Sequence, residues 1–109
     1  MLASCDKGPD PLDVDALGAL LGADRRISFT RFRMSGTANI WADGTFEVNI
    51  PALGTDTGHW WLDGNMICSR WNQVRRGQDL CAFVAKTENG YVGLSANGKA
   101  TLGTFQILK

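Results

Sequence analysis

The chain has 109 residues, which is the usual size of one domain and leaves no room for a second folding unit in this sequence. Its 11 basic and 11 acidic residues balance to zero, so bulk charge gives no reason to expect binding to nucleic acid or to an anionic membrane. With 44 % hydrophobic residues the chain is not disordered, and it has the material for one modest core.

The zero net charge is the sum of two oppositely charged parts of the chain. Residues 1–24 carry an excess of aspartates, whereas residues 25–109 carry an excess of bases. Four arginines crowd the start of the second part: Arg25, Arg26, Arg31 and Arg33. They form either a solvated face or a site for an anion or a partner, because the planar guanidinium suits carboxylate and phosphate groups.

The first residues resemble a bacterial lipobox. Leu2-Ala3-Ser4-Cys5 has an aliphatic residue and two small residues before a cysteine, and the resemblance implies that Cys5 is the lipid-bearing first residue of a mature periplasmic or membrane-anchored lipoprotein. Residues 1–11 would then be the lipobox-like start and a tether. A full signal peptide needs a basic and an apolar region upstream. Either the sequence begins inside a signal peptide or after a misplaced start codon, or the match arose by chance and the protein is cytoplasmic.

One amphipathic helix is predicted over 11–21, with Gly22 as its stop. From Ile27 onward the pattern changes to short apolar runs separated by glycine and asparagine turns, which predicts strands. The expected strands are 27–34, 36–41, 45–50, 58–62, 66–72, 80–86, 91–95 and 101–107. Tight turns cannot make parallel crossovers. The predicted fold class is therefore mainly β: an antiparallel meander of about eight strands in residues 12–109, forming a small barrel or a strongly bent sheet, with the helix capping it.

Two of the three cysteines are expected to lie opposite each other. A hairpin centred between Val74 and Arg75 places Cys68 directly across from Cys81, where the Cβ separation suits a disulfide after a small adjustment. Two reduced buried thiols are the alternative in a cytosolic protein. No metal site is expected, because the cysteines and the single histidine lack metal-binding spacing.

The tryptophans near the cysteines suggest a binding surface. If Leu62 pairs with Met66 across a three-residue turn, Trp60 shares the interior face with the two cysteines, and Trp61 lies on the opposite face with Trp71. Buried aromatic core is one interpretation of these rings, and an aromatic-walled ligand site or protein contact is the other. The candidate surface comprises His59, Trp61, Arg70, Trp71, Arg31 and Arg33.

Signatures of enzymes are sparse. Gly93 to Lys99 matches half of a phosphate-binding loop, but Ala100 stands where a Ser or Thr should hold magnesium, and no helix is expected to follow. One histidine makes no catalytic triad with Ser69, Ser95 or Cys81. No catalytic residue and no cofactor are therefore expected.

A longer pattern also carries a resemblance. The run from Gly58 to Trp71, then Cys81, then Asn89-Gly90-Tyr91, resembles the G-x-W…C-x-x-W…C…G-x-Y pattern of small secreted bacterial β-domains of unknown function. That resemblance implies a periplasmic or lipid-tethered location and a paired Cys68 and Cys81. The architecture is also similar to lipocalin-like small barrels and to lipoprotein inhibitors of lysozyme, although the signatures of the inhibitors are missing.

The sequence thus favours an exported, non-enzymatic binding domain that recognises a protein partner or a cell-envelope component. A lipocalin-like binder of a small apolar ligand is the second hypothesis. A single-stranded nucleic-acid binder is less favoured, and it requires Trp41, Trp61 and Trp71 to lie exposed in line with arginines. An enzyme is the remaining alternative.

Overall fold

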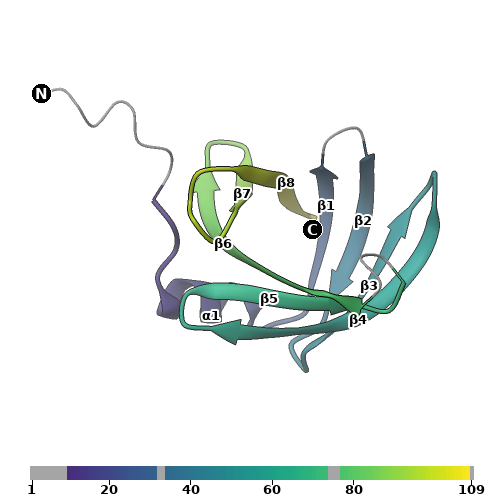
Figure 1. The fold of residues 1–109 in the computed structure, drawn as a ribbon, viewed down its shortest axis with the longest axis horizontal. Helices are drawn as coiled ribbons and strands as arrows, with labels where there is room; N and C mark the ends of the chain where they lie inside the picture. The colour runs from purple at the N-terminus through teal and green to yellow at the C-terminus, as the bar shows by residue number, and fades with distance from the viewer. Residues whose placement is uncertain (1–9, 32–33, 74–76, 109) are drawn as a thin grey trace, which may run out of the picture.

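Eight antiparallel strands close into a barrel in the computed structural model, which describes residues 10–31, 34–73 and 77–108 (Figure 1). Each strand pairs with the next one along the chain, and the last strand returns to pair with the first. This confirms the predicted antiparallel meander and selects the barrel over the bent sheet. The elements in chain order are α1 (Val14–Leu21), β1 (Arg25–Arg31), β2 (Met34–Ile40), β3 (Thr45–Ile50), β4 (Gly54–Asp63), β5 (Met66–Trp71), β6 (Asp79–Thr87), β7 (Gly90–Leu94) and β8 (Thr101–Leu108).

Alternation of apolar and polar residues decides which side chains enter the barrel. In β3 the side chains of Phe46, Val48 and Ile50 are buried, whereas Glu47 and Asn49 between them are exposed. Successive side chains of a strand point to opposite faces, so this pattern turns the apolar set inward. The inward residues of β1, β2 and β3 form one core cluster with buried Ile27, Ala38, Phe46 and Val48.

Helix α1 begins later than predicted. It starts at Val14, because Asp13 adopts an extended backbone and its side chain accepts a hydrogen bond from the Ala16 N–H at 2.8 Å. Pro11 pairs with Ala85 of β6 instead of joining the helix. The predicted stop is confirmed, since Leu21 is the last helical residue before Gly22.

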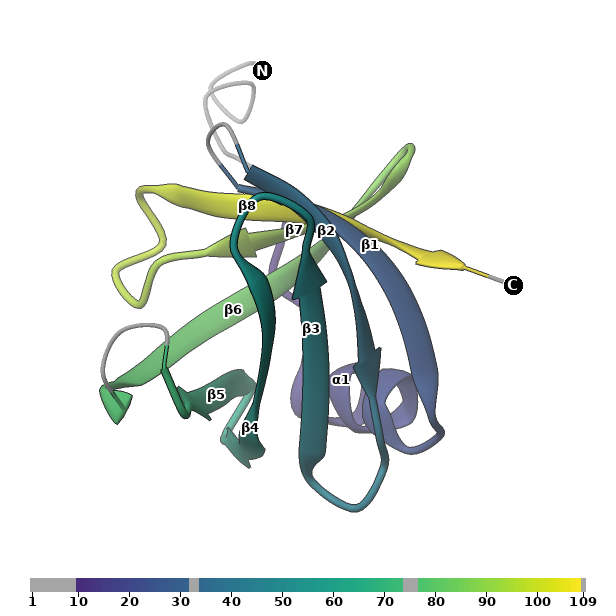
Figure 2. The same cartoon turned by 90° about the vertical axis from the view of Figure 1, so that its right-hand side faces the viewer.

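The helix closes one end of the barrel, where β1 begins and β2 ends (Figure 2). Leu17 and Leu21 are buried and pack with Val84 of β6 in a second core cluster. Arg25, at the start of β1, donates from Nε to the Leu20 carbonyl at 2.7 Å and so satisfies the last turn of the helix. Arg25, one of the four clustered arginines, therefore has a structural role. The packing of Leu17 and Leu21 confirms that the helix caps the barrel, as predicted.

A short segment before the helix closes a gap between two strands. β5 pairs with β6 only as far as Phe83, and the rest of β6 continues alongside β7. Beyond that point the Leu12 N–H donates to the Val84 carbonyl at 2.7 Å, and Pro11 bridges to Ala85. Residues 11–12 thus supply backbone pairing where β5 leaves β6.

The β4–β5 turn corrects one prediction. Met66 pairs with Asp63, not with Leu62, so the turn contains Gly64 and Asn65 alone. A shift of one residue moves every side chain of a strand to the other face. Trp60 therefore lies on the inner face and does not pack against the disulfide, which is on the outer face with Trp61.

Candidate ligand-binding cavity

The barrel interior is not filled. A cavity of about 240 Å³ lies between the strands, and it reaches the end of the barrel opposite α1, where β1 ends and β2 begins. Its lining residues in the described parts of the chain are Ile27, Phe29, Arg31, Met34, Ala38, Ile40, Phe46, Val48, Ile50, Trp60, Ile67, Ser69 and Trp71. Apart from Arg31 and Ser69, this lining is apolar.

Small side chains keep the cavity open. The interior of an eight-stranded barrel is just wide enough for side chains to fill it. Here Ala38 of β2 and Ser69 of β5 stand at inward positions where larger residues would occupy the space. The surrounding walls are held by alternate residues of β1, β3 and β5, so the cavity shape depends on strand register more than on loops.

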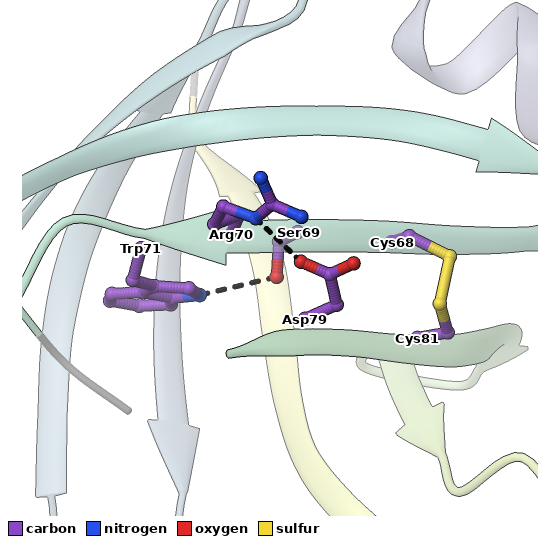
Figure 3. Close-up of a disulfide and its surroundings, with 6 residues drawn as sticks. All are labelled: Cys68, Ser69, Arg70, Trp71, Asp79 and Cys81. Atoms are coloured by element: carbon purple, nitrogen blue, oxygen red, sulfur yellow. Dashed lines mark hydrogen bonds and ion pairs between the residues drawn. A yellow bond between two sulfur atoms is a disulfide. The ribbon is translucent and has the colours of Figure 1, made fainter. Parts of the chain in front are cut away.

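Both tryptophans of the cavity have partners for their indole N–H groups. Trp71 donates to the Ser69 hydroxyl at 3.2 Å, and Trp60 donates to the Trp41 carbonyl at 2.9 Å (Figure 3 shows the first bond). Trp71 also packs edge-on against Phe46, with ring centroids 5.1 Å apart. Because the polar atoms are satisfied, the rings present apolar surface to the cavity.

Arg31 is the one charged residue among the described lining residues. It is the last residue of β1 and follows Ile27 and Phe29 on the inner face, so it lies at the open end of the cavity. Its side chain is half-buried. Among the described lining residues, the site is an apolar pocket that holds one charged side chain, that of Arg31, near its open end.

Comparison with protein-family models, curated proteins and solved structures found no match. The resemblance to small secreted β-domains therefore stays a prediction. What the protein binds has to be inferred from the cavity and the surface themselves.

Of the six residues of the predicted binding surface, the five that the structure describes are not brought together. His59, Trp61 and Arg70 lie on the outer face of β4 and β5, whereas Trp71 and Arg31 line the cavity. Arg33 and Cys5 lie outside the described residues. The separation follows from the alternation of side chains, since Arg70 and Trp71 are neighbours in one strand.

The outer face carries a row of cross-strand contacts. Arg70 Nε lies 2.7 Å from Asp79 Oδ1, and the guanidinium lies 6.0 Å from the centre of the Trp61 ring. The Cys68–Cys81 disulfide, with an S–S distance of 2.07 Å, is two residues further along the same pair of strands (Figure 3). The hydrogen bond from Arg70 lowers the pKa of Asp79, and the carboxylate raises the pKa of Arg70.

Replacing Asp79 with asparagine should remove a small, pH-dependent part of the stability. The folded-state pKa of Asp79 is lowered, so its contribution is present above the ordinary carboxyl pKa of about 3.9 and is lost as pH falls through the lowered value. Both side chains are exposed, so the Tm difference at pH 7 should be a few degrees at most. Thermal unfolding of wild type and variant at pH 7 and near pH 2 measures this Tm difference. A Tm difference of the same size at both pH values would contradict the pairing of Asp79 with Arg70.

Other site classes find little support in the described parts of the chain. The row of exposed tryptophans required for nucleic-acid stacking does not form, because Trp71 lies inside the barrel while Trp61 lies outside. The described residues hold no group of three or more His, Cys, Asp or Glu side chains placed to bind a metal ion. Among these residues no helix has the length and apolar character needed to span a membrane.

Proposed function

We propose that this protein is a non-enzymatic binding domain that takes a small apolar ligand, or the apolar part of a larger one, into the barrel cavity. The observation that carries the proposal is the cavity of about 240 Å³ with an almost entirely apolar lining and an opening at one end. A dry apolar cavity of about 150 Å³ is enough to bind benzene. Small-molecule sites are usually concave, mostly apolar and supplied with few polar groups.

This proposal favours the second of the hypotheses drawn from the sequence. Recognition of a protein or a cell-envelope component would use the outer face, where Trp61 is about one-third exposed beside Arg70. That face offers a single exposed ring above a strand pair. The cavity offers a concave site with thirteen described lining residues, and it supports ligand binding more strongly.

A neutral fluorescent probe tests the proposal. We expect N-phenyl-naphthylamine to brighten and saturate on titration with the wild-type protein, and the emission of Trp60 and Trp71 to change in parallel. The Ala38→Phe variant should not bind the probe, because its added ring occupies the cavity. Burying that ring in empty apolar space should leave the fold intact or raise its stability.

A matched variant separates blocking from general damage. Ala52→Phe adds the same ring at an exposed turn, and it should bind the probe like wild type. Ala38→Leu fills less of the cavity and should weaken binding partially, which provides a second test if the phenylalanine is too large to fold. A wild-type protein that binds no probe, or a folded Ala38→Phe variant that binds it normally, would overturn the proposal.

The location of the protein belongs to the same proposal. Disulfides persist in exported proteins and are rare in the cytosol, so the Cys68–Cys81 bond is consistent with export. We propose that the domain acts in the periplasm and that Cys5 carries a lipid anchor. The support for the anchor is the lipobox-like run Leu2-Ala3-Ser4-Cys5.

A further inference from the structure

Three isoleucines separate the barrel cavity from a second apolar hollow, which has a volume of about 70 Å³ and lies beneath α1. We propose that Ile27, Ile40 and Ile67 are the specificity-determining residues of the cavity. They form a partition that stops the apolar part of a ligand before it reaches the helix. If the proposed function holds, on which this inference rests, the cavity selects short apolar segments over long ones.

The linings of the two hollows identify the partition. Among the described residues, only Ile27 of β1, Ile40 of β2 and Ile67 of β5 line both the cavity and the hollow. The leucines of α1 line the hollow alone, and the two tryptophans of the cavity line the cavity alone. The three isoleucines therefore stand between the space for a ligand and the helix.

The strands bring the three side chains to one level of the barrel from opposite walls. Ile27 is near the start of β1 and Ile40 is the last residue of β2, so both lie near the end that α1 closes. β5 lies opposite β1 in the closed ring of strands, so Ile67 approaches from the other side. Isoleucine is branched at Cβ and has restricted χ1 rotamers, which makes it suited to a stiff partition.

The helix behind the partition is fixed on both sides. Before α1 the Leu12 N–H donates to the Val84 carbonyl at 2.7 Å, and after it Arg25 donates to the Leu20 carbonyl at 2.7 Å. Leu17, in the middle of α1, is fully buried. The hollow of about 70 Å³ is roughly half of the ~150 Å³ that is enough to bind benzene, so it does not take a ligand by itself.

A series of 1-alkanols from butanol to decanol measures the length that the cavity accepts, because their head group carries no charge. Displacement of N-phenyl-naphthylamine from wild-type protein should give affinities that rise roughly fourfold with each added methylene. The rise should stop at the chain length that reaches the partition, because further carbons stay in water. An affinity that keeps rising through the whole series would overturn the inference.

Ile67→Ala is the variant that opens the partition. Truncation of this side chain joins the cavity to the hollow, so the affinity should keep rising for about two further methylenes. An alkanol of that length should bind the variant roughly tenfold more tightly than it binds wild type. Ile67→Val removes less and should extend the limit by about one methylene, which provides a second test if the alanine variant does not fold.

Leu20→Ala is the matched control. It removes the same number of carbon atoms as Ile67→Ala, but Leu20 lines only the hollow, on the helix side of the partition. This variant enlarges the hollow without opening it to the cavity, so the chain-length limit should stay that of wild type. Circular dichroism checks that each variant is folded.

The outcomes separate this inference from the proposed function. An unchanged limit in the folded Ile67 variants, or an equal extension in Leu20→Ala, would overturn the partition while the proposed function stands. Binding of the probe without displacement by any alkanol would have the same meaning. Failure of the probe and of every alkanol to bind wild-type protein would overturn both.

Discussion

Replacing Gly58 with alanine is expected to destabilise the barrel by about 2–4 kcal/mol, or roughly 10–15 °C in Tm. Gly58 lies on the inner face of β4, between Phe46 of β3 and Trp71 of β5. A Cβ atom here would overlap the backbone carbonyl oxygen of Arg70 and would lie 2.6 Å from Cζ of Phe46. The carbonyl cannot move without disturbing the β4–β5 pairing. Chemical denaturation monitored by circular dichroism measures the effect.

Gly18→Ala is the opposite case and serves as the control. Gly18 is in the middle of α1, and a Cβ there would have nothing within 4 Å. Alanine is favoured over glycine inside a helix by about 1 kcal/mol, so this variant should be more stable than wild type. Loss of stability in both variants, or a Gly58→Ala protein as stable as wild type, would contradict the packing described for β4.

Reduction of the disulfide is expected to lower the free energy of unfolding by about 3 kcal/mol, because Cys68 and Cys81 close a short loop with a sequence separation of 13. The Tm should fall by roughly 10–15 °C. The Cys68→Ala/Cys81→Ala variant should lose at least as much, since Cys68 is almost fully buried and its truncation also leaves space. Thermal unfolding with and without reductant provides the comparison.

Two independent measurements check the covalent state. Thiol counting on unfolded, unreduced protein should detect no reactive thiol at Cys68 or Cys81, and a count of three would contradict the bond. The intact mass of the native protein should be lower by two hydrogens than the reduced mass. It should be higher by the mass of the lipid if Cys5 is acylated, and an unmodified Cys5 in native material would contradict the anchor.

Much of the fold could be predicted because the turns carry local signals. Pairs such as Asp43-Gly44 and Asn89-Gly90 adopt positive φ readily, and Gly44 and Gly90 have φ values of 95° and 153°. Once strands of known length are joined by such turns, antiparallel pairing follows without long-range information. The same reasoning placed Cys68 opposite Cys81, and the register confirms it.

The error at Trp60 and Trp61 has a local cause. Asp63, Gly64 and Asn65 all favour turns, so composition alone does not distinguish a turn of two residues from one of three. Pairing of Asp63 with Met66 requires the shorter turn, in which Gly64 has φ of 60°. The alternation in β4 was ambiguous as well, because both tryptophans are apolar.

The cavity could be predicted only in part. The sequence points to Arg31 and Trp71, but it predicts them as parts of an exposed binding surface and not as cavity residues. It gives no such indication for Met34 and Ala38, which also line the cavity. A signal was present in Ile27, Phe29 and Arg31, which alternate along one strand and place an arginine in line with apolar inward residues. Whether an interior is filled depends on side chains from five strands meeting in space, which no local pattern encodes.

The pairing of Pro11 and Leu12 with β6 limits how far the domain can stand from an anchor. Six residues separate Cys5 from Pro11, counting Pro11 itself, and a fully extended chain spans at most about 3.6 Å per residue. The reach is therefore about 20 Å, less than the thickness of the hydrocarbon core of a bilayer. A lipid on Cys5 would therefore hold the barrel close against the membrane surface.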